Sequence, residues 1–216
     1  PPRTKAVRQQ HPGAKVHRFG HNDSSLYTNH DGASGRPIVM RTDPELYDPV
    51  SQIAVLDFGY GNDSLAWRRS AVIVRNSYWV FERFEMRRMR DRAFWVGARG
   101  SGYNNTFREL HLHHADTLGI DNEALILVNA SGRETNNVIL QNHLHHVGNI
   151  DRATDEFIDR AGGNGGCFYT ETRLTYDSVA PAAGDNATLA EWEAGILPPD
   201  SHVYLIGNWV HDCHYG

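Results

Sequence analysis

The chain contains little of several things that mark common classes of protein. Only two of its 216 residues are cysteines, and its only lysines are Lys5 and Lys15. No apolar run approaches the ~20 residues of a membrane-spanning helix, and the N-terminus carries no signal peptide. The formal net charge is −5 with acidic and basic residues mixed, so no basic footprint for nucleic acid is present. The composition excludes a membrane span, a nucleic-acid-binding domain and a disulfide framework, and fits one domain with a sizeable core.

What the chain does contain is a repeat. Four segments overlay on one another with apolar and polar residues alternating: 79–89, 105–115, 137–147 and 202–213. The alignment superposes Met86, Leu112, Leu144 and Val210. Alternation of period two is typical of half-buried strands, and recurrence at a few tens of residues is typical of a solenoid.

A second apolar run precedes each of these segments. The runs cover 71–74, 93–96, 124–128 and 167–170, and Asn- and Gly-rich turns separate them from the repeated segments. One unit therefore reads strand, corner, strand, corner, which predicts an all-β parallel β-helix. An amphipathic helix is the alternative, because His111 and His114 also fall at helical spacing. Enrichment in Val, Ile and aromatic residues favours strands.

With these repeats the chain resembles the right-handed parallel β-helix superfamily, which includes polysaccharide lyases, glycoside hydrolases and uronan epimerases. Residues 11–20, 31–41 and 77–86 resemble its opening strand, its Gly-rich turn and its first full rung. The resemblance implies one secreted, extracellular or periplasmic β-helix domain over 1–216. Residues 1–66 would form N-terminal rungs or a cap, and 67–216 the repeated rungs. Residues 177–201 would form an inserted loop with a short helix.

The sequence also makes predictions about the two cysteines and the two chain ends. Cys167 and Cys213 fall at inward positions, which predicts buried free thiols rather than a disulfide. The chain opens at Pro1 rather than Met, as a processed chain would. It ends at Gly216 with no capping element for the last rung, so we expect further protein to follow or another chain to stack there.

Stacked rungs turn the repeat into columns of outward side chains about 4.8 Å apart. The first column holds Glu85, His111, His143 and Trp209; the second holds Arg87, His113, His145 and His211; the third, at a corner, holds Arg88, His114, His146 and Asp212.

One interpretation of these columns is a face that binds anions and transfers protons. Arg87 would neutralise the carboxylate of an acidic glycan, and His113 or His145 would take the C5 proton of a uronate. Many β-helix lyases use a basic Lys or Arg, often with calcium. Residues 122–131 resemble a strand of the alginate and chondroitin lyase group, with Ala130 in place of its lysine.

A second interpretation is a metal site. The His-x-His pairs 111/113 and 143/145 offer nitrogen ligands for zinc or copper. Asp116, Asp121 and Glu123 offer oxygen ligands for calcium.

A third interpretation is structural, with the histidines forming a solvated, stacked column. Asn142 and Asn208 are expected to form an inward ladder that satisfies the backbone at a bend.

Further candidates lie outside the columns. Tyr169 and Arg173 share a strand face, where Tyr169 would be a general acid and Arg173 a substrate contact. The remaining substrate-binding candidates are Arg88, His111, His143, Trp192 and Trp209, the two tryptophans as sugar-stacking platforms. The acids Asp155, Glu156 and Asp159 are candidates for a carboxylate pair or a calcium loop.

The sequence therefore favours a lyase that cleaves an acidic polysaccharide by β-elimination. The alternatives are a non-catalytic glycan-binding, adhesin or structural module, and a metal-dependent glycan hydrolase or epimerase.

Overall fold

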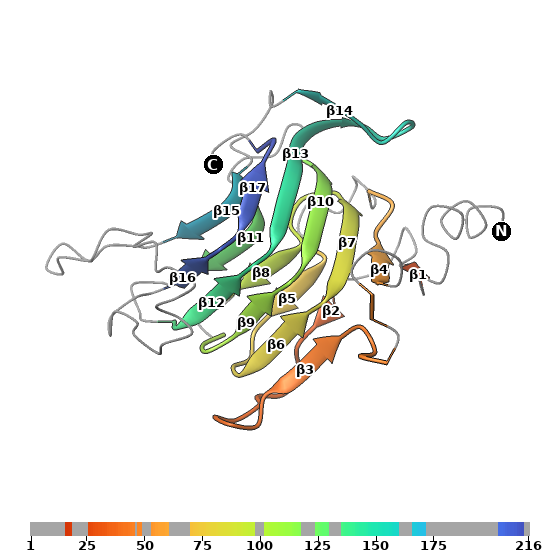
Figure 1. The fold of residues 1–216 in the computed structure, drawn as a ribbon. Coiled ribbons are helices and arrows are strands. Elements are labelled where there is room, and N and C mark those ends of the chain that lie inside the picture. The colour runs from red at the N-terminus through yellow and green to blue at the C-terminus, as the bar shows by residue number, and fades with distance from the viewer. Residues whose placement is uncertain are drawn as a thin grey trace, which may run out of the picture.

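A computed structural model of the chain is built from β-strands and turns throughout the part that it describes. That part comprises residues 16–18, 26–45, 47–48, 53–60, 70–97, 102–117, 124–129, 135–159, 166–171 and 203–213. Within it there is no helix long and apolar enough to cross a membrane. The inserted loop and short helix expected at 177–201 lie outside the described residues. The strands form three sheets, in which the pairing is parallel except between β13 and β14 (Figure 1).

The first sheet contains β1 (Val16–Arg18), β4 (Ala54–Asp57), β7 (Phe84–Met89), β10 (His111–Asp116), β13 (His143–Asp151), β14 (Glu156–Asp159) and β17 (Trp209–His211). The second contains β2 (Leu26–Tyr27), β5 (Val72–Val74), β8 (Phe94–Val96), β11 (Ala124–Asn129) and β15 (Gly166–Glu171). The third contains β3 (Ile38–Arg41), β6 (Trp79–Glu82), β9 (Thr106–Arg108), β12 (Asn137–Leu140) and β16 (Val203–Ile206).

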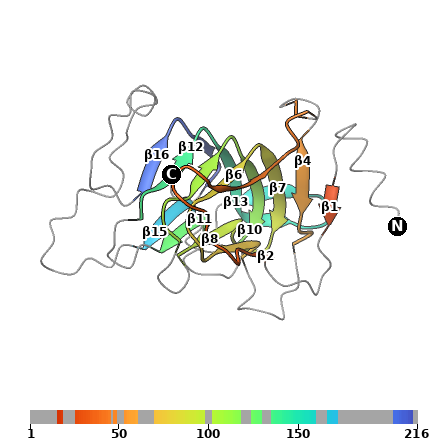
Figure 2. The ribbon, with the colours of Figure 1, turned by 90° about the horizontal axis from the view of Figure 1, so that it is seen from below.

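From β2 onward the chain visits the second, third and first sheets in turn and then begins again. We call each such pass a rung; the rungs are β2–β4, β5–β7, β8–β10, β11–β13 and β15–β17. Figures 1 and 2 show the strands of successive rungs lying side by side. The predicted register is confirmed, because Leu112 pairs with Met86 and Leu144, and Leu144 pairs with Val210.

The prediction of two strands per unit is wrong, because each rung has three. The segments expected to be single strands bend into two, one in the third sheet and one in the first. The bend falls at Arg83, Glu109, Gln141 and Gly207, all with positive φ. Positive φ turns the chain sharply and is uncommon for residues other than Gly, Asn and Asp, so Arg83 and Glu109 gave no sequence signal of a bend. The bends at Gln141 and Gly207 lie beside Asn142 and Asn208, whose predicted ladder did indicate a bend.

The core lies between the three sheets and is aromatic at its centre. Phe107 stacks on Phe81 with ring centroids 5.2 Å apart and meets Phe94 edge-on at 4.9 Å. Met86, Leu112 and Leu144 of the first sheet point into the same core, whereas Val210, on the last rung, is 39% exposed. The alternation then sends the side chains of the intervening residues to the opposite side of that sheet.

Asparagine ladders hold the backbone at two corners of the coil. The predicted ladder is confirmed: the Asn142 Oδ1 accepts from the Leu110 N–H at 2.9 Å, and the Asn208 Oδ1 accepts from the Asn142 N–H at 2.9 Å. A second ladder joins Asn105 and Asn137, where the Asn137 Oδ1 accepts from the Asn105 N–H at 2.9 Å.

The two cysteines are disulfide-bonded, so the prediction of free thiols is wrong. Cys167 and Cys213 are buried, as expected, with Cα atoms 5.5 Å apart. One follows the start of β15 and the other follows β17, so the bond links the second and first sheets within the last rung. Two inward cysteines on adjacent sheets of one rung come within bonding distance, which their separation of 46 residues did not reveal.

Candidate histidine site

The predicted outward columns are present on the first sheet. In the first column, His111 pairs in register with Glu85 and His143, and His143 with Trp209. In the second, His113 pairs with Arg87 and His145, and His145 with His211. The third column lies at a corner, and its members all have positive φ: Arg88, His114, His146 and Asp212. We call these three columns together the histidine face.

The histidine face is largely shielded from solvent, although it points away from the core. His113 and His145 are 9% and 8% exposed, and Glu85 is 2% exposed. Trp209, at the end of the first column, is 64% exposed. Glu85, Arg87, His113 and His145 are buried, and the other members of the face are partly buried apart from the exposed Trp209. The face is therefore less exposed to solvent than the column of the structural interpretation.

The hairpin formed by β13 and β14 covers part of the third column. The ring of Phe157 meets that of His146 edge-on, with centroids 5.2 Å apart. The carboxylate of Asp155 lies 3.6 Å from the guanidinium of Arg88.

Each side chain of the first column reaches diagonally to the second-column histidine of the next rung. The atoms joined in this way, a histidine Nε2 with another Nε2 or with the Glu85 Oε1, lie between 2.8 and 3.2 Å apart. The Nδ1 of each second-column histidine then faces the third-column residue of its own rung. We call the resulting series hydrogen-bonded chains, and in order they are Glu85–His113–His114, His111–His145–His146 and His143–His211–Asp212.

Stacking along the columns keeps these rings in register. His111 and His143 lie parallel with centroids 4.7 Å apart, as do His113 and His145 at 5.0 Å. Trp209 stacks on His143 at 4.1 Å. The spacing is close to that of the rungs themselves, so the backbone pairing sets the ring positions.

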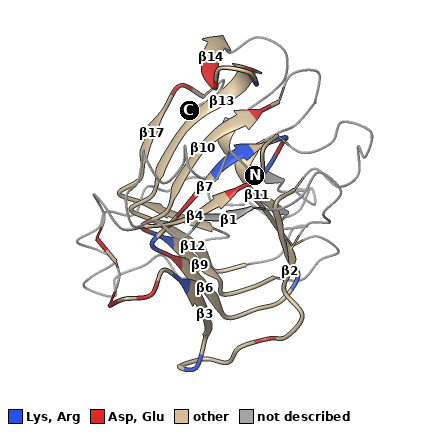
Figure 3. Cartoon of the chain, turned by 90° about the vertical axis from the view of Figure 1, so that its right-hand side faces the viewer, with Lys and Arg blue, Asp and Glu red and all other residues tan. Residues whose placement is uncertain are grey.

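Carboxylates of the protein already neutralise the two arginines of the face. Arg87 lies 3.6 Å from Asp57 and 3.4 Å from Glu85, and Arg88 forms a two-pronged pair with Asp57. Figure 3 shows basic and acidic segments beside one another around β7. A substrate carboxylate at Arg87 would therefore share the guanidinium with these acids.

Burial lowers the pKa of most histidines on the face. It lowers the pKa of His111 to about 3 and that of His114 to about 4, and neighbouring His113 adds to both shifts. The pKa values of His143, His145 and His146 are also lowered, chiefly by burial. These imidazoles are neutral at pH 7, so each keeps one nitrogen lone pair.

Glu85 is ionised in spite of its burial. Burial alone would raise its pKa, but the hydrogen bond from His113 and the charges of His113 and Arg87 lower it to about 2. The face thus carries a fixed negative charge beside its neutral rings.

The other predicted site residues are not brought together on this face. Tyr169 lies on the second sheet in register with Leu127, is 40% exposed and shows no contact with the histidines among the described residues. The carboxylate of Asp116 pairs with Arg152 at 2.5 Å and Arg90 at 3.8 Å. Asp121, Glu123, Arg173 and Trp192 lie outside the described residues, so the calcium site stays a prediction.

Sequence reasoning missed Asp57 among the acids around the arginines. Asp57 belongs to the second column, because β4 pairs with β7 and sets Asp57 beside Arg87. Residues 54–57 read Ala-Val-Leu-Asp and lack the alternation of the later repeats, because Val55 stands where those repeats have a polar residue, so the repeat pattern did not reveal this carboxylate. Asp155, a candidate acid from the sequence, reaches Arg88 from a turn.

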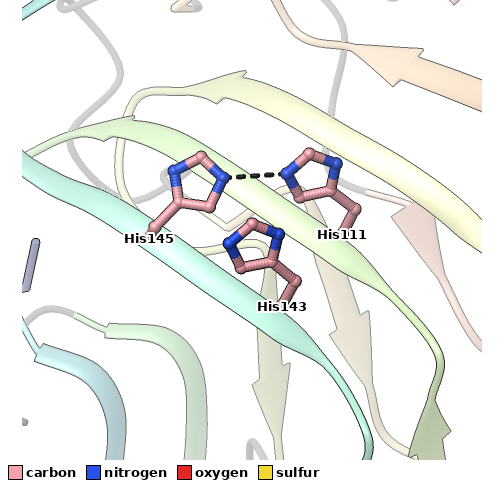
Figure 4. A group of neighbouring side chains, drawn as sticks. All are labelled: His111, His143 and His145. Carbon is pink, nitrogen blue, oxygen red and sulfur yellow. Dashed lines mark hydrogen bonds between the residues drawn. The ribbon is translucent and has the colours of Figure 1, made fainter. Parts of the chain in front are cut away.

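Three groups of side chains on the face have ligand atoms that all lie within 4.8 Å of one another. They are His111, His143 and His145; Glu85, His111 and His113; and His146, His211 and Asp212. Figure 4 shows the first group, in which two strands direct three imidazoles toward one place. Histidine nitrogens so arranged suit a borderline divalent cation such as Zn²⁺ or Cu²⁺.

Comparisons of the chain with protein-family models, with curated proteins and with solved structures found no match.

Proposed function

We propose that this chain is a secreted right-handed parallel β-helix protein that cleaves an acidic, uronate-containing polysaccharide by β-elimination at the histidine face. The observation that carries the proposal is the open end of the face. There the exposed Trp209 stacks on His143, next to neutral His145. An exposed indole is a platform for a sugar ring, and a neutral imidazole is a proton acceptor.

In the proposed reaction His145 or His113 takes the C5 proton of the uronate. The C4–C5 double bond forms, the C4–O bond breaks, and its electron pair leaves on the oxygen, which is then protonated. Arg87, beside Glu85 and Asp57, would hold the substrate carboxylate and so acidify C5. His111, His143 and Arg88 would line the path of the glycan, with Tyr169 as the predicted acid for the leaving oxygen.

The test is the ultraviolet absorbance of unsaturated uronate on alginate, pectate and chondroitin, each with calcium and with a chelator. We expect activity on one of these polymers, and a loss of at least about 100-fold in kcat for His145→Ala or His113→Ala. Tyr169→Phe serves as a test of the predicted acid. Full activity in both histidine variants would overturn the proposed mechanism.

A non-catalytic glycan-binding module is the second candidate, and one observation favours it. Arg87 and Arg88 are both engaged by internal carboxylates, as expected of side chains that hold the face together rather than act on substrate. Retention of a polymer on the protein without any absorbance change, abolished by Trp209→Ala, would select this candidate.

A further inference from the structure

We propose that His111, His143 and His145 bind one divalent transition-metal ion, Zn²⁺ or Cu²⁺. The three side chains come from β10 and β13, which are adjacent parallel strands. The proposal rests on these rings alone and is tested without glycan. With the metal bound, His145 has no lone pair left to accept a proton, so His113 would be the base of the proposed lyase reaction.

The spacing of the ring nitrogens suits a shared cation. The Nε2 atoms of His111 and His145 lie 2.8 Å apart, and the ligand atoms of all three residues lie within 4.8 Å of one another. Two nitrogens bound to one tetrahedral Zn²⁺ at about 2.0–2.1 Å would be separated by roughly 3.3 Å. The distance between His111 and His145 is about half an ångström below that value, and the limit of 4.8 Å on the others allows it, so the three nitrogens can share one cation after small ring rotations.

This group differs from the other two because it contains no carboxylate. In the first hydrogen-bonded chain Glu85 accepts a hydrogen bond from His113 Nε2 at 3.2 Å. In the third, Asp212 accepts one from His211 Nδ1 at 2.7 Å. Hydrogen bonds to an acid explain both of those contacts. Between His111 and His145 no acid among the described residues fixes the proton, and a cation would engage both lone pairs at once.

The surroundings supply the outer contacts that metal-bound histidines need. The Nδ1 of His145 faces the Nδ1 of His146, so His145 can donate its proton there and leave Nε2 for the metal. The ionised Glu85 reaches the neighbouring ring of His113 and supplies negative charge beside the cation. Three protein ligands leave a fourth position for water or a substrate oxygen.

The experiment is calorimetric titration of Zn²⁺ into the full chain after treatment with a chelator, with Ca²⁺ titrated in parallel. We expect one Zn²⁺ per chain, and at least about a 100-fold weaker Kd in His143→Ala and His145→Ala, because each loses a direct ligand. Electron paramagnetic resonance of the Cu²⁺ form should show nitrogen ligation, which keeps the test open if an alanine variant fails to fold.

Matched controls separate this site from its neighbours. Asp212→Asn and His114→Asn change the same face outside the three ligands, and asparagine tolerates the positive φ of both positions. Both variants should bind Zn²⁺ as the unchanged chain does. The proposal is overturned if the chain binds no Zn²⁺, if His143→Ala and His145→Ala bind it unchanged, or if Asp212→Asn abolishes binding.

Discussion

The second-column histidines occupy equivalent positions on successive rungs but carry their protons on different nitrogens. His113 donates from Nε2 to Glu85, whereas His211 donates from Nδ1 to Asp212. The carboxylate lies at the start of the first hydrogen-bonded chain, as Glu85, and at the end of the third, as Asp212. The ring nitrogen that carries the proton therefore differs between His113 and His211. His145 lies between them with imidazoles on both sides. The same backbone geometry, repeated on successive rungs, thus gives three hydrogen-bonded chains that differ in chemistry.

Acid should destabilise the protein in two stages set by single residues. Partly buried His111 and His114 have pKa values lowered from 6.5 to about 3 and about 4, so below pH 6.5 the unfolded chain binds more protons than the folded one. Glu85, lowered from 4.5 to about 2, adds stability that is present above 4.5 and lost as the pH falls toward 2.

Glu85→Gln tests the second stage. We expect it to lower the unfolding free energy near neutral pH by about 1–3 kcal/mol, because the buried His113 and Arg87 lose their ionised partner. The difference from the unchanged chain should shrink as acid protonates Glu85 in the latter. Urea unfolding across this pH range measures both effects, and a constant difference at every pH would contradict the assignment.

At the scale of the strands, asparagine ladders determine how one element passes to the next. Asn142 accepts from the Leu110 N–H and donates to the Phe107 carbonyl, both 2.9 Å away. The Leu110 N–H lies between β9 and β10, and the Phe107 carbonyl belongs to β9. The ladder therefore adds side-chain hydrogen bonds to the backbone at this corner.

Replacing Asn142 with alanine should destabilise the protein by about 2–4 kcal/mol, because a buried donor and a buried acceptor both lose their partner. Asn142→Asp is the matched control: it keeps an acceptor for Leu110 and loses the donor to Phe107. Thermal unfolding should rank the unchanged chain above the control and the control above the alanine variant. Equal melting of all three would show that water replaces the ladder.

The elements themselves show which features a sequence reveals. Apolar alternation predicted the register of the first sheet, because Met86, Leu112 and Leu144 occupy equivalent positions that face the core. The bends at Arg83 and Glu109 were missed because neither residue is typical of positive φ. The burial of His113 was missed for another reason: alternation indicates which side of a sheet a residue occupies, but not what covers that side.

For the molecule as a whole, the disulfide is the one covalent cross-link between side chains in the described part of the chain. Cys167 and Cys213 are 46 residues apart, and a loop of that length corresponds to about 4 kcal/mol of stabilisation through the unfolded state. The bond closes the last rung, next to Trp209 and His211. Its loss should therefore loosen the open end of the histidine face.

We expect reducing agent, or the Cys167→Ala, Cys213→Ala double variant, to lower the melting temperature by several degrees. Calorimetry with and without reductant measures this, and reductant should have no effect on the double variant. If reductant leaves the melting temperature of the unchanged chain the same, the disulfide has no structural role.

The corner that carries the third column also sets a limit on engineering. Arg88, His114, His146 and Asp212 hold φ values of 51–57°, which disfavour any residue with a Cβ by about 1 kcal/mol or more. Glycine would relieve this at each position, and a search for thermostable variants would select it there. At His114, His146 and Asp212 each such gain would delete a member of the hydrogen-bonded chains, and at Arg88 it would delete the ion pair with Asp57. Higher stability and an intact site therefore place opposite demands on the same four residues.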